Sequence, residues 1–472
     1  MKPIDLLITN GFVITQNQNG DEYPSGAVAI DGAQIVEIGD TSSLISHYDA
    51  KKTIDARDKC VFPGFINTHT HLFQTFMKGL GEGIPLFEWL RKVTTPGILH
   101  MGEDDFYLSA MIGCLDAIQS GTTTLVEFMY PNPFHEMGDA IFQALSESGM
   151  RALLGRGVAD IGDNDEYPAT AFYADLLEPL DEAMSDCVRL AALCKERGEE
   201  RIGFCLAPPN VRTIKPSTFK IFQDFAHDQE CMITTHISET SWDNEIIFKR
   251  HGLGVAEWLE QVDFLNSNLL AVHCVHPSKD DIQRFEAKHV KVSYNPVSNM
   301  YLGDGIAPIR QFLDNDITVS IGTDGAASNN SQDMLEVIKT GLLLQRAATQ
   351  DPSVLSSKDM FRMATIDGAR SIGLSDQIGS LESGKKADVV IADFNCPISA
   401  PYYNPISTLV FSSSPEIIDT VIIHGRVVLE DRQFQTINID EIVRRAHIAG
   451  HRLANRSYGK DVLDTCKIRL VQ

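Results

Sequence analysis

The middle of the chain alternates short apolar segments with segments of helical periodicity, and this alternation is the feature that most restricts the fold. Between residues 62 and 375 the pattern repeats roughly eight times. Strands are predicted at residues 122–126, 151–154, 202–206, 232–235, 269–272, 291–293 and 319–321, and helices at residues 104–118, 173–197, 217–226 and 332–344. Repeated strand–helix units of this kind favour an α/β fold, a parallel (β/α)8 TIM barrel.

The two ends of the chain are instead rich in short strands and turns. Residues 5–15, 27–30 and 34–38 alternate or run apolar, and residues 387–392, 420–423 and 426–429 repeat this pattern near the other end. We therefore predict a small β-sandwich domain assembled from both termini, residues 1–61 and 376–472, with a C-terminal helix. The barrel domain is predicted to comprise residues 62–375, and 472 residues suffice for both domains.

Composition narrows the choice of partners. The net charge of −24 is spread along the chain, and an acidic surface repels phosphate backbones and anionic lipid. We therefore predict neither a nucleic-acid nor a membrane partner. There is no apolar run long enough to span a bilayer and no basic-then-apolar N-terminus. The nine cysteines form no C-x-x-C pair, which suits a reducing compartment, so we predict a cytoplasmic protein.

Histidines and one aspartate follow the apolar segments. His69 and His71 lie at i and i+2, so on a strand their side chains point to the same side and can offer two nitrogen ligands to one metal ion. His236, His273 and Asp324 also follow predicted strands, at the end of a barrel where active sites lie. His69, His71, His236 and Asp324 together leave a ligand position open for water, as a catalytic metal site requires.

Each of these positions suggests a chemical role. A divalent ion lowers the pKa of its bound water, so that hydroxide exists at neutral pH. Glu239 lies three residues after His236 and reaches the same site without being a ligand, so it can move a proton from the water to a ring nitrogen. His273 would hydrogen-bond the attacking oxygen or the substrate, and Asp324 would orient the hydroxide. A single histidine at a strand end is more often a polar core residue. The set His69, His71, His236, His273 and Asp324, each at the end of a predicted strand, is not explained that way.

Longer motifs resemble a known family. Besides His236-x-x-Glu239, Val272-His273-Cys274 and Gly322-Thr323-Asp324, they are PGFINTHTH at 63–71, NPVSN and LGDGIAP within 295–308, TDGAASNNS at 323–331 and MATIDGAR at 363–370. In order and spacing they resemble the amidohydrolase superfamily, over nearly the whole chain. The chain is more similar to the branch acting on N-heterocycles, which includes methylthioadenosine/adenosylhomocysteine deaminases, guanine and hydroxypurine deaminases, and triazine hydrolases.

The resemblance implies an enzyme that hydrolyses C–N bonds other than peptide bonds in cyclic amidines. It implies the same roles: His69, His71, His236 and Asp324 as metal ligands, with Glu239, His273 and Asp324 as catalytic residues. It also implies a small heterocyclic substrate and a homo-oligomer. Binuclear relatives use a carbamylated lysine on the fourth strand, but residues 202–209 contain no lysine. We therefore predict one divalent ion, zinc first and iron as the alternative.

The substrate is less well determined by the sequence. At Gln74 the chain resembles guanine deaminases and triazine hydrolases, which also have glutamine at this position. The carboxamide can pair with an adjacent ring N–H and C=O. Methylthioadenosine/adenosylhomocysteine deaminases typically have Met at this position and a His-x-Pro-Tyr block, where this chain has APPNVR at 207–212. Residues 324–330 look more like nucleoside deaminases. Gln74, Trp89 and His273 are the predicted substrate-binding residues, with Phe128, Trp242 and Glu245 as further candidates.

The main hypothesis is a hydrolytic deaminase. Metal-bound hydroxide would attack the amino-bearing carbon of a free pyrimidine, oxopurine, pterin or triazine base and release ammonia. The alternatives are a methylthioadenosine/adenosylhomocysteine deaminase and a triazine hydrolase that displaces chloride or another leaving group. A third hypothesis, a non-catalytic scaffold that has lost its ligands, conflicts with the presence of all five site residues.

Overall fold

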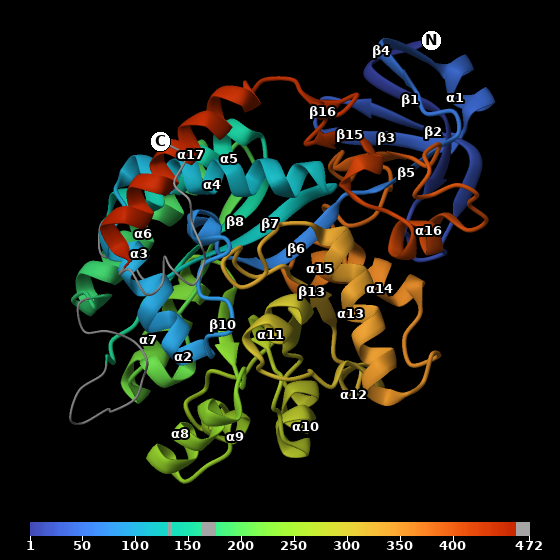
Figure 1. Ribbon diagram of the computed structural model, residues 1–472. Helices are drawn as coiled ribbons and strands as arrows, with labels where there is room; N and C mark the ends of the chain where they lie inside the picture. Colours follow the sequence, from blue (N-terminus) through green and yellow to red (C-terminus); the bar gives the residue numbers. More distant parts are fainter. Residues whose placement is uncertain (131, 133–134, 163–175, 459–472) are drawn as a thin grey trace.

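A computed structural model describes residues 1–130, 132, 135–162 and 176–458, and it arranges the strands in two sheets (Figure 1). One sheet holds eight parallel strands that neighbour each other in chain order, β6 (Phe65–Thr70), β7 (Thr122–Met129), β8 (Arg151–Arg156), β9 (Ile202–Leu206), β10 (Ile233–Ile237), β11 (Leu269–His273), β12 (Lys291–Tyr294) and β13 (Val319–Ile321). The backbone N–H of Asp324, just after β13, donates to the carbonyl oxygen of His69 on β6 at 2.9 Å. The predicted (β/α)8 barrel is confirmed.

Helices follow the barrel strands and surround the sheet (Figure 1). Among the described residues the longer ones are α4 (Glu103–Gln119), α5 (Glu136–Ser148), α6 (Leu180–Arg197), α7 (Pro216–Asp228), α8 (Ser241–His251), α10 (Lys279–Ala287) and α13 (Met334–Thr349). The helix predicted to start at residue 173 begins at Leu180, directly after Pro179, whose ring lacks the N–H that a helix interior needs. Residues 173–175 of that prediction lie outside the described residues.

Both chain ends contribute to the second sheet. Its strands are β1 (Lys2–Ile14), β2 (Glu22–Asp31), β3 (Gln34–Asp40), β4 (Tyr48–Asp55), β5 (Lys59–Pro63), β14 (Val389–Asp393), β15 (Ile418–Ile423), β16 (Arg426–Glu430) and β17 (Gln433–Phe434). Antiparallel pairing of β5 with β14 joins the N-terminal strands to the C-terminal ones. The sheet has an apolar core of its own, with Leu6, Ile8, Val28, Val389 and Ile391 among its buried members. This architecture confirms the predicted small β-sandwich from both termini.

The C-terminal helix α17 (Ile439–Ser457) leaves the second sheet and lies against α4 of the barrel (Figure 1). Arg456 on α17 donates to a carboxylate oxygen of Asp105 at 2.9 Å, and the Tyr458 hydroxyl donates to the carbonyl of Val93 at 3.1 Å. The exact domain boundaries stay a prediction, and residues 459–472 lie outside the described residues.

A buried ion pair fixes the terminal sheet to the barrel. Arg151, at the start of β8, donates through Nε and Nη2 to the two carboxylate oxygens of Asp388 at 2.6 and 3.1 Å. The backbone carbonyl of Asp388 in turn accepts from the N–H of Gly64, immediately before β6. Separating the pair would leave two unpaired charges buried, which is costly. Since Asp388 also binds Gly64, the pair holds the start of β6 against the terminal sheet.

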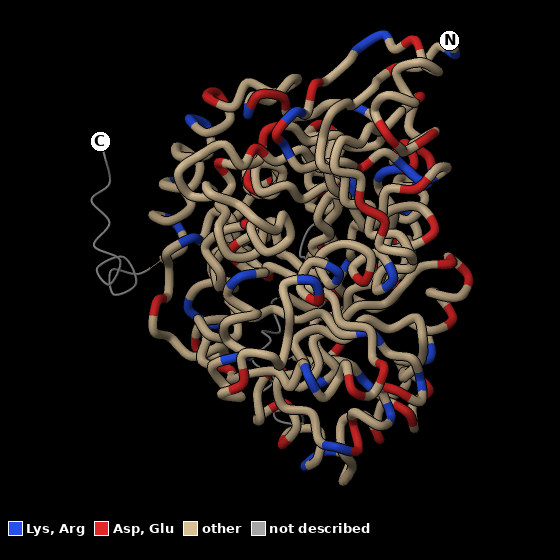
Figure 2. Tube along the Cα trace, turned by 90° about the vertical axis from the view of Figure 1, so that its right-hand side faces the viewer, with Lys and Arg blue, Asp and Glu red and all other residues tan. Residues whose placement is uncertain are grey.

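The surface agrees with the sequence composition. Figure 2 shows acidic and basic residues interleaved along the outside of the chain rather than gathered in one block. Among the described residues no helix combines the length and the apolar character that crossing a bilayer requires. The eight cysteines in this part of the chain are all free thiols.

Glu127 supports the strand end that carries His71. The Glu127 side chain is fully buried and its Oε2 accepts from the N–H of Leu72 at 2.8 Å. Its other oxygen, Oε1, has no hydrogen-bond partner among the described residues. Burial raises the pKa of this carboxyl to about 8, so the folded protein holds a proton here that the unfolded chain releases near pH 4.5.

We expect Glu127→Gln to flatten the pH dependence of stability. Wild-type stability should fall as the pH rises from about 5 to 8, because only the unfolded state ionises freely in that range. At pH 9 the variant should be the more stable protein by about 5 kcal/mol, because the pKa rises from 4.5 to about 8 and each unit corresponds to about 1.4 kcal/mol, and at pH 4 the two should be similar. Urea unfolding at a series of pH values measures this difference. Parallel wild-type and variant curves would contradict the buried, protonated state.

Candidate active site

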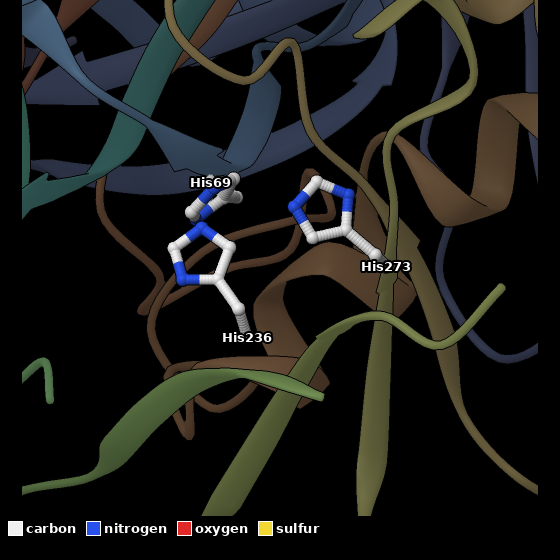
Figure 3. A group of neighbouring side chains, drawn as sticks. All are labelled: His69, His236 and His273. Atoms are coloured by element: carbon white, nitrogen blue, oxygen red, sulfur yellow. The ribbon is translucent and has the colours of Figure 1, made fainter. Parts of the chain in front are cut away.

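Five predicted residues meet at the carboxyl ends of the barrel strands. His69 and His71 come from the end of β6, His236 from β10, His273 from the last position of β11, and Asp324 from the segment after β13. Figure 3 shows the rings of His69, His236 and His273 turned toward one another. The ring centroids of His69 and His236 lie 4.9 Å apart, and those of His236 and His273 lie 5.1 Å apart. All five side chains are buried.

Two of the five site residues, His273 and Asp324, have an unusual backbone conformation at the point where a strand ends. His273 and Asp324 have φ angles of 69° and 63°, in the left-handed region that residues with a Cβ rarely adopt. Such strain persists only where the surrounding structure holds it, and it gathers at functional sites. Here it coincides with the two positions at which β11 and the segment after β13 present side chains to the barrel mouth.

Backbone carbonyls set the protonation of two histidines. Nδ1 of His71 lies 2.6 Å from the carbonyl oxygen of Phe128, and Nδ1 of His236 lies 2.5 Å from that of Pro209. A carbonyl oxygen can only accept, so in both rings Nδ1 carries the proton and donates it. The Nε2 lone pairs of His71 and His236 are therefore free to bind a metal ion, an arrangement common among metal-ligating histidines.

The contacts of Asp324 test whether the site suits a cation. Its Oδ1 lies 3.4 Å from Nε2 of His69 and 3.3 Å from Nε2 of His71. Neither ring nitrogen of His69 has a hydrogen-bond partner among the described residues, and burial lowers the pKa of His69 to about 3. A carboxylate oxygen and an Nε2 lone pair at such distances repel each other unless a positive charge lies between them. These nitrogen and oxygen donors fit a divalent ion such as zinc.

Asp324 keeps its negative charge in this buried position. Burial by itself raises the pKa of the carboxyl, but the imidazoles of His69, His71 and His273 outweigh it and hold the pKa well below its ordinary value. Oδ1 also accepts from the N–H of Gly325 at 2.6 Å. The carboxylate is thus fixed in orientation and ionised throughout the neutral range.

Glu239 lies beside this group without joining either set of potential ligands. Its Oε1 is 3.6 Å from Nε2 of His273. The potential ligand sets among the described residues are His69, His71 and Asp324, and His69, His236 and His273. Burial first, and then the nearby carboxylates of Asp304, Asp243 and Asp324, raise the pKa of Glu239 well above its ordinary value. A carboxyl with a raised pKa at this place is suited to accept and release a proton.

A pocket opens next to the histidines. Its lining includes His71, Gln74, Leu86, Trp89, Leu90, Thr94, Ile98, Tyr130, Arg212, His236, Glu239, Leu302 and Asp324. The predicted substrate residues Gln74 and Trp89 thus both face it. Gln74 donates to the Tyr130 hydroxyl at 3.4 Å, while its Oε1 has no partner among the described residues. A carboxamide held this way can meet a polar edge of a ligand.

Three of the additional candidates lie elsewhere. Phe128 packs edge-on against the rings of His69, His71 and His236, behind these histidines rather than in the pocket lining. Trp242 contacts Phe87, with ring centroids 3.9 Å apart. The side chain of Glu245 is 59% exposed on α8 and pairs with Lys249, because that face of the helix points to solvent.

Arg212 and Asn210 line the pocket, although neither was predicted as a site residue. Arg212 forms a buried ion pair with Asp243, and its guanidinium lies 5.3 and 5.8 Å from the ring centroids of Phe87 and Trp242. Both residues lie in the loop after β9, so the rule that barrel sites gather at strand ends could have found them.

The fold and the site define a metal-dependent hydrolase of the (β/α)8 class. The profile of the amidohydrolase family matches residues 60–428, and the chain belongs to this family. The enzyme is a hydrolase acting on C–N bonds in cyclic amidines, and within that class it is a hydrolytic deaminase.

Curated relatives match nearly end to end. A 5-methylthioadenosine/S-adenosylhomocysteine deaminase of Syntrophobacter fumaroxidans is 34% identical over 441 residues, covering 93% of this chain and 96% of the relative. A 5'-deoxyadenosine deaminase of Methanothermobacter thermautotrophicus is 33% identical over 425 residues, covering 89% and 95%. The crystal structure of an adenosine deaminase from Xanthomonas campestris with bound zinc has a TM-score of 0.87 at 25% identity, covering 96% of this chain and 99% of that one.

We expect His71→Ala and His236→Ala to lose metal. Each change removes an imidazole whose Nε2 is free to coordinate, so zinc affinity should fall by about 100-fold or more. Zinc content after dialysis against a weak chelator measures the loss. His47→Ala, which removes an exposed histidine of the terminal domain, is the control and should retain wild-type zinc. Full zinc occupancy in both site variants would mean that the ligands lie elsewhere.

Proposed function

We propose that the protein hydrolyses the exocyclic amino group of an adenosine-type nucleoside, with one divalent ion held by His69, His71, His236 and Asp324. The observation that carries the proposal is the placement of Glu239, outside the ligand sets but 3.6 Å from His273 and in the lining of the pocket. When bound, the ion lowers the pKa of water and so supplies the nucleophile at neutral pH.

The residues around the pocket account for the proton transfers. Glu239 takes one proton from the attacking water and delivers it to the ring nitrogen next to the amino-bearing carbon. His273 faces Glu239 and Asp324 and steadies the incoming oxygen by a hydrogen bond. A further proton, moved by Glu239, converts the amino group into the leaving ammonia. Water and the aminated ring thus become an oxo ring and ammonia.

Two observations support a nucleoside rather than the free base predicted from the sequence. Relatives that match over most of the chain are named for adenosine derivatives that are altered at the 5' position. The pocket combines polar groups at Gln74 and Glu239 with apolar walls, which are formed by Leu86, Trp89, Leu90, Ile98 and Leu302. An adenosine-type nucleoside whose ribose carries an apolar group at the 5' position suits such a lining.

One observation favours a free base as the second candidate. The Oε1 atom of Gln74 is buried beside the pocket without a partner among the described residues. An oxo-substituted base has a ring N–H that can donate to this oxygen, whereas the adenine ring of a nucleoside has none. Leaving such a group unpaired costs about 1–3 kcal/mol, so Gln74 would discriminate in favour of such a base.

Glu239→Gln should lower kcat by about 1,000-fold or more, because the amide cannot carry the proton from water to the ring. Zinc content should stay at the wild-type value, since Glu239 is not a ligand. Glu245→Gln makes the same change on the exposed face of the adjoining helix and should leave kcat unchanged. Near-normal turnover in Glu239→Gln would show that another group moves the proton.

Ammonia release from a panel of aminated heterocycles identifies the substrate. We expect turnover of 5'-deoxyadenosine and methylthioadenosine, with guanine, cytosine, isocytosine, aminopterins and aminotriazines turned over at least about 100-fold less efficiently in kcat/KM. Efficient release only from free bases would establish the second candidate. Chloride release from a chlorotriazine without ammonia would mean a different leaving group.

A further inference from the structure

Two asparagine amides face the ring of His273 from behind. Asn299, on α11 (Pro296–Leu302), places Nδ2 2.9 Å from Nδ1 of His273, and Asn295 places Nδ2 3.4 Å from the same atom. Both asparagines and His273 are buried. An amide nitrogen only donates hydrogen bonds, so Nδ1 of His273 is the acceptor and carries no proton.

Asp304 fixes the orientation of the Asn299 amide. Nδ2 of Asn299 also lies 3.4 Å from Oδ2 of Asp304. Exchanging the nitrogen and oxygen of this amide would set a carbonyl oxygen against that carboxylate, which is unfavourable. Asn299 Oδ1 has no partner among the described residues, so the amide leaves its acceptor unpaired and uses its donor. Asn295 is oriented independently, because its Oδ1 accepts from the Ser293 hydroxyl at 3.3 Å.

His273 therefore differs from His71 and His236 in which ring nitrogen carries the proton. A carbonyl oxygen faces Nδ1 in His71 and in His236, whereas amide N–H groups face Nδ1 in His273. A neutral imidazole has one protonated nitrogen. The proton of His273 must then lie on Nε2, which points toward Glu239 Oε1 at 3.6 Å and Asp324 Oδ2 at 3.8 Å, with no hydrogen-bond partner among the described residues.

We propose that Asn299, held by Asp304 and assisted by Asn295, is a positioning residue that makes His273 an Nε2–H hydrogen-bond donor and excludes it from metal ligation. A metal ligand needs a free lone pair, and Nε2 of His273 has none in this tautomer. Although His273 could geometrically complete a set with His69 and His236, its tautomer removes it from that set.

The consequence for catalysis rests on the proposed function. An N–H directed into the site can donate to an oxygen on which negative charge develops, and such a donor contributes most when it is oriented in advance. The tautomer itself can be measured without any substrate or metal, so its failure and the failure of the proposed function are separate results.

The experiment is nitrogen NMR of full-length, metal-free protein labelled with ¹⁵N-histidine. Chemical shifts distinguish protonated from unprotonated ring nitrogens, and His273→Gln identifies the His273 signals by their loss. Spectra are recorded at pH 8.5, above the pKa of Asp304, which burial raises to about 7. We expect protonated Nε2 and unprotonated Nδ1 in the wild type. A proton on Nδ1 of His273 overturns the proposal.

An exchange variant tests Asn299 itself. Asn299→Asp combined with Asp304→Asn keeps one amide and one carboxylate, so no charge is added, but it places an acceptor against Nδ1. The proton should move to Nδ1, and kcat of the zinc enzyme should fall by about 100-fold or more with a smaller change in KM. Unchanged signals from His273 in this variant would overturn the role of Asn299.

Two further variants complete the test. Asn299→Leu combined with Asn295→Leu removes both donors without supplying an acceptor, and should give a mixture of both tautomers if the exchange variant does not fold. A single Nε2–H tautomer in the variant that lacks both donors would overturn the role of the two asparagines. Asn404→Asp is the matched amide-to-carboxylate control, because Asn404 caps α16 (Pro405–Phe411) in the terminal region and accepts from the N–H of Ser407. It should leave both the spectrum and kcat at wild-type values.

Discussion

The hydrogen bond from the Asp324 N–H to the His69 carbonyl is the contact on which the site most depends. β6 and β13 are the first and last strands of the barrel, and this bond lies where they meet. It places the only carboxylate of the proposed ligand set beside two imidazoles from a segment more than 250 residues earlier in the chain. Closing the barrel and assembling the donor set are therefore one event, and the strained backbone at Asp324 is held by the same closure.

Much of this architecture follows from local sequence patterns. Every predicted barrel strand overlaps an observed one, because short apolar segments flanked by helical periodicity leave few alternatives. The polar residues directly after those segments were also predictable as the site, since parallel strands bring their carboxyl ends to one face. β4 was not predicted, because its alternation is carried largely by exposed polar residues such as Lys51 and Lys52.

What the sequence did not predict depends on contacts between distant residues. The orientations of the His71, His236 and His273 rings depend on a carbonyl or an amide contributed from elsewhere in the fold, and periodicity says nothing about which of these faces a ring. Arg212 is buried because Asp243 and two aromatic rings surround it, so a charged residue in a loop became part of the pocket lining. The free-base substrate was predicted from Gln74 and the block at 207–212, whereas the walls of the pocket come from several separate segments.

The pairing of β5 with β14 has a consequence for the order in which the protein matures. β5 leads directly into β6, yet its partner strand is the stretch Val389–Asp393, and Asp388 beside it holds Gly64 in place. During synthesis His69 and His71 leave the ribosome early. The strand β14, which pairs with β5 just before them, follows only after the whole barrel has been translated. The nascent chain therefore carries its earliest potential ligands before one of the two neighbours of β5 exists, and a fully formed binding centre is a property of the finished polypeptide.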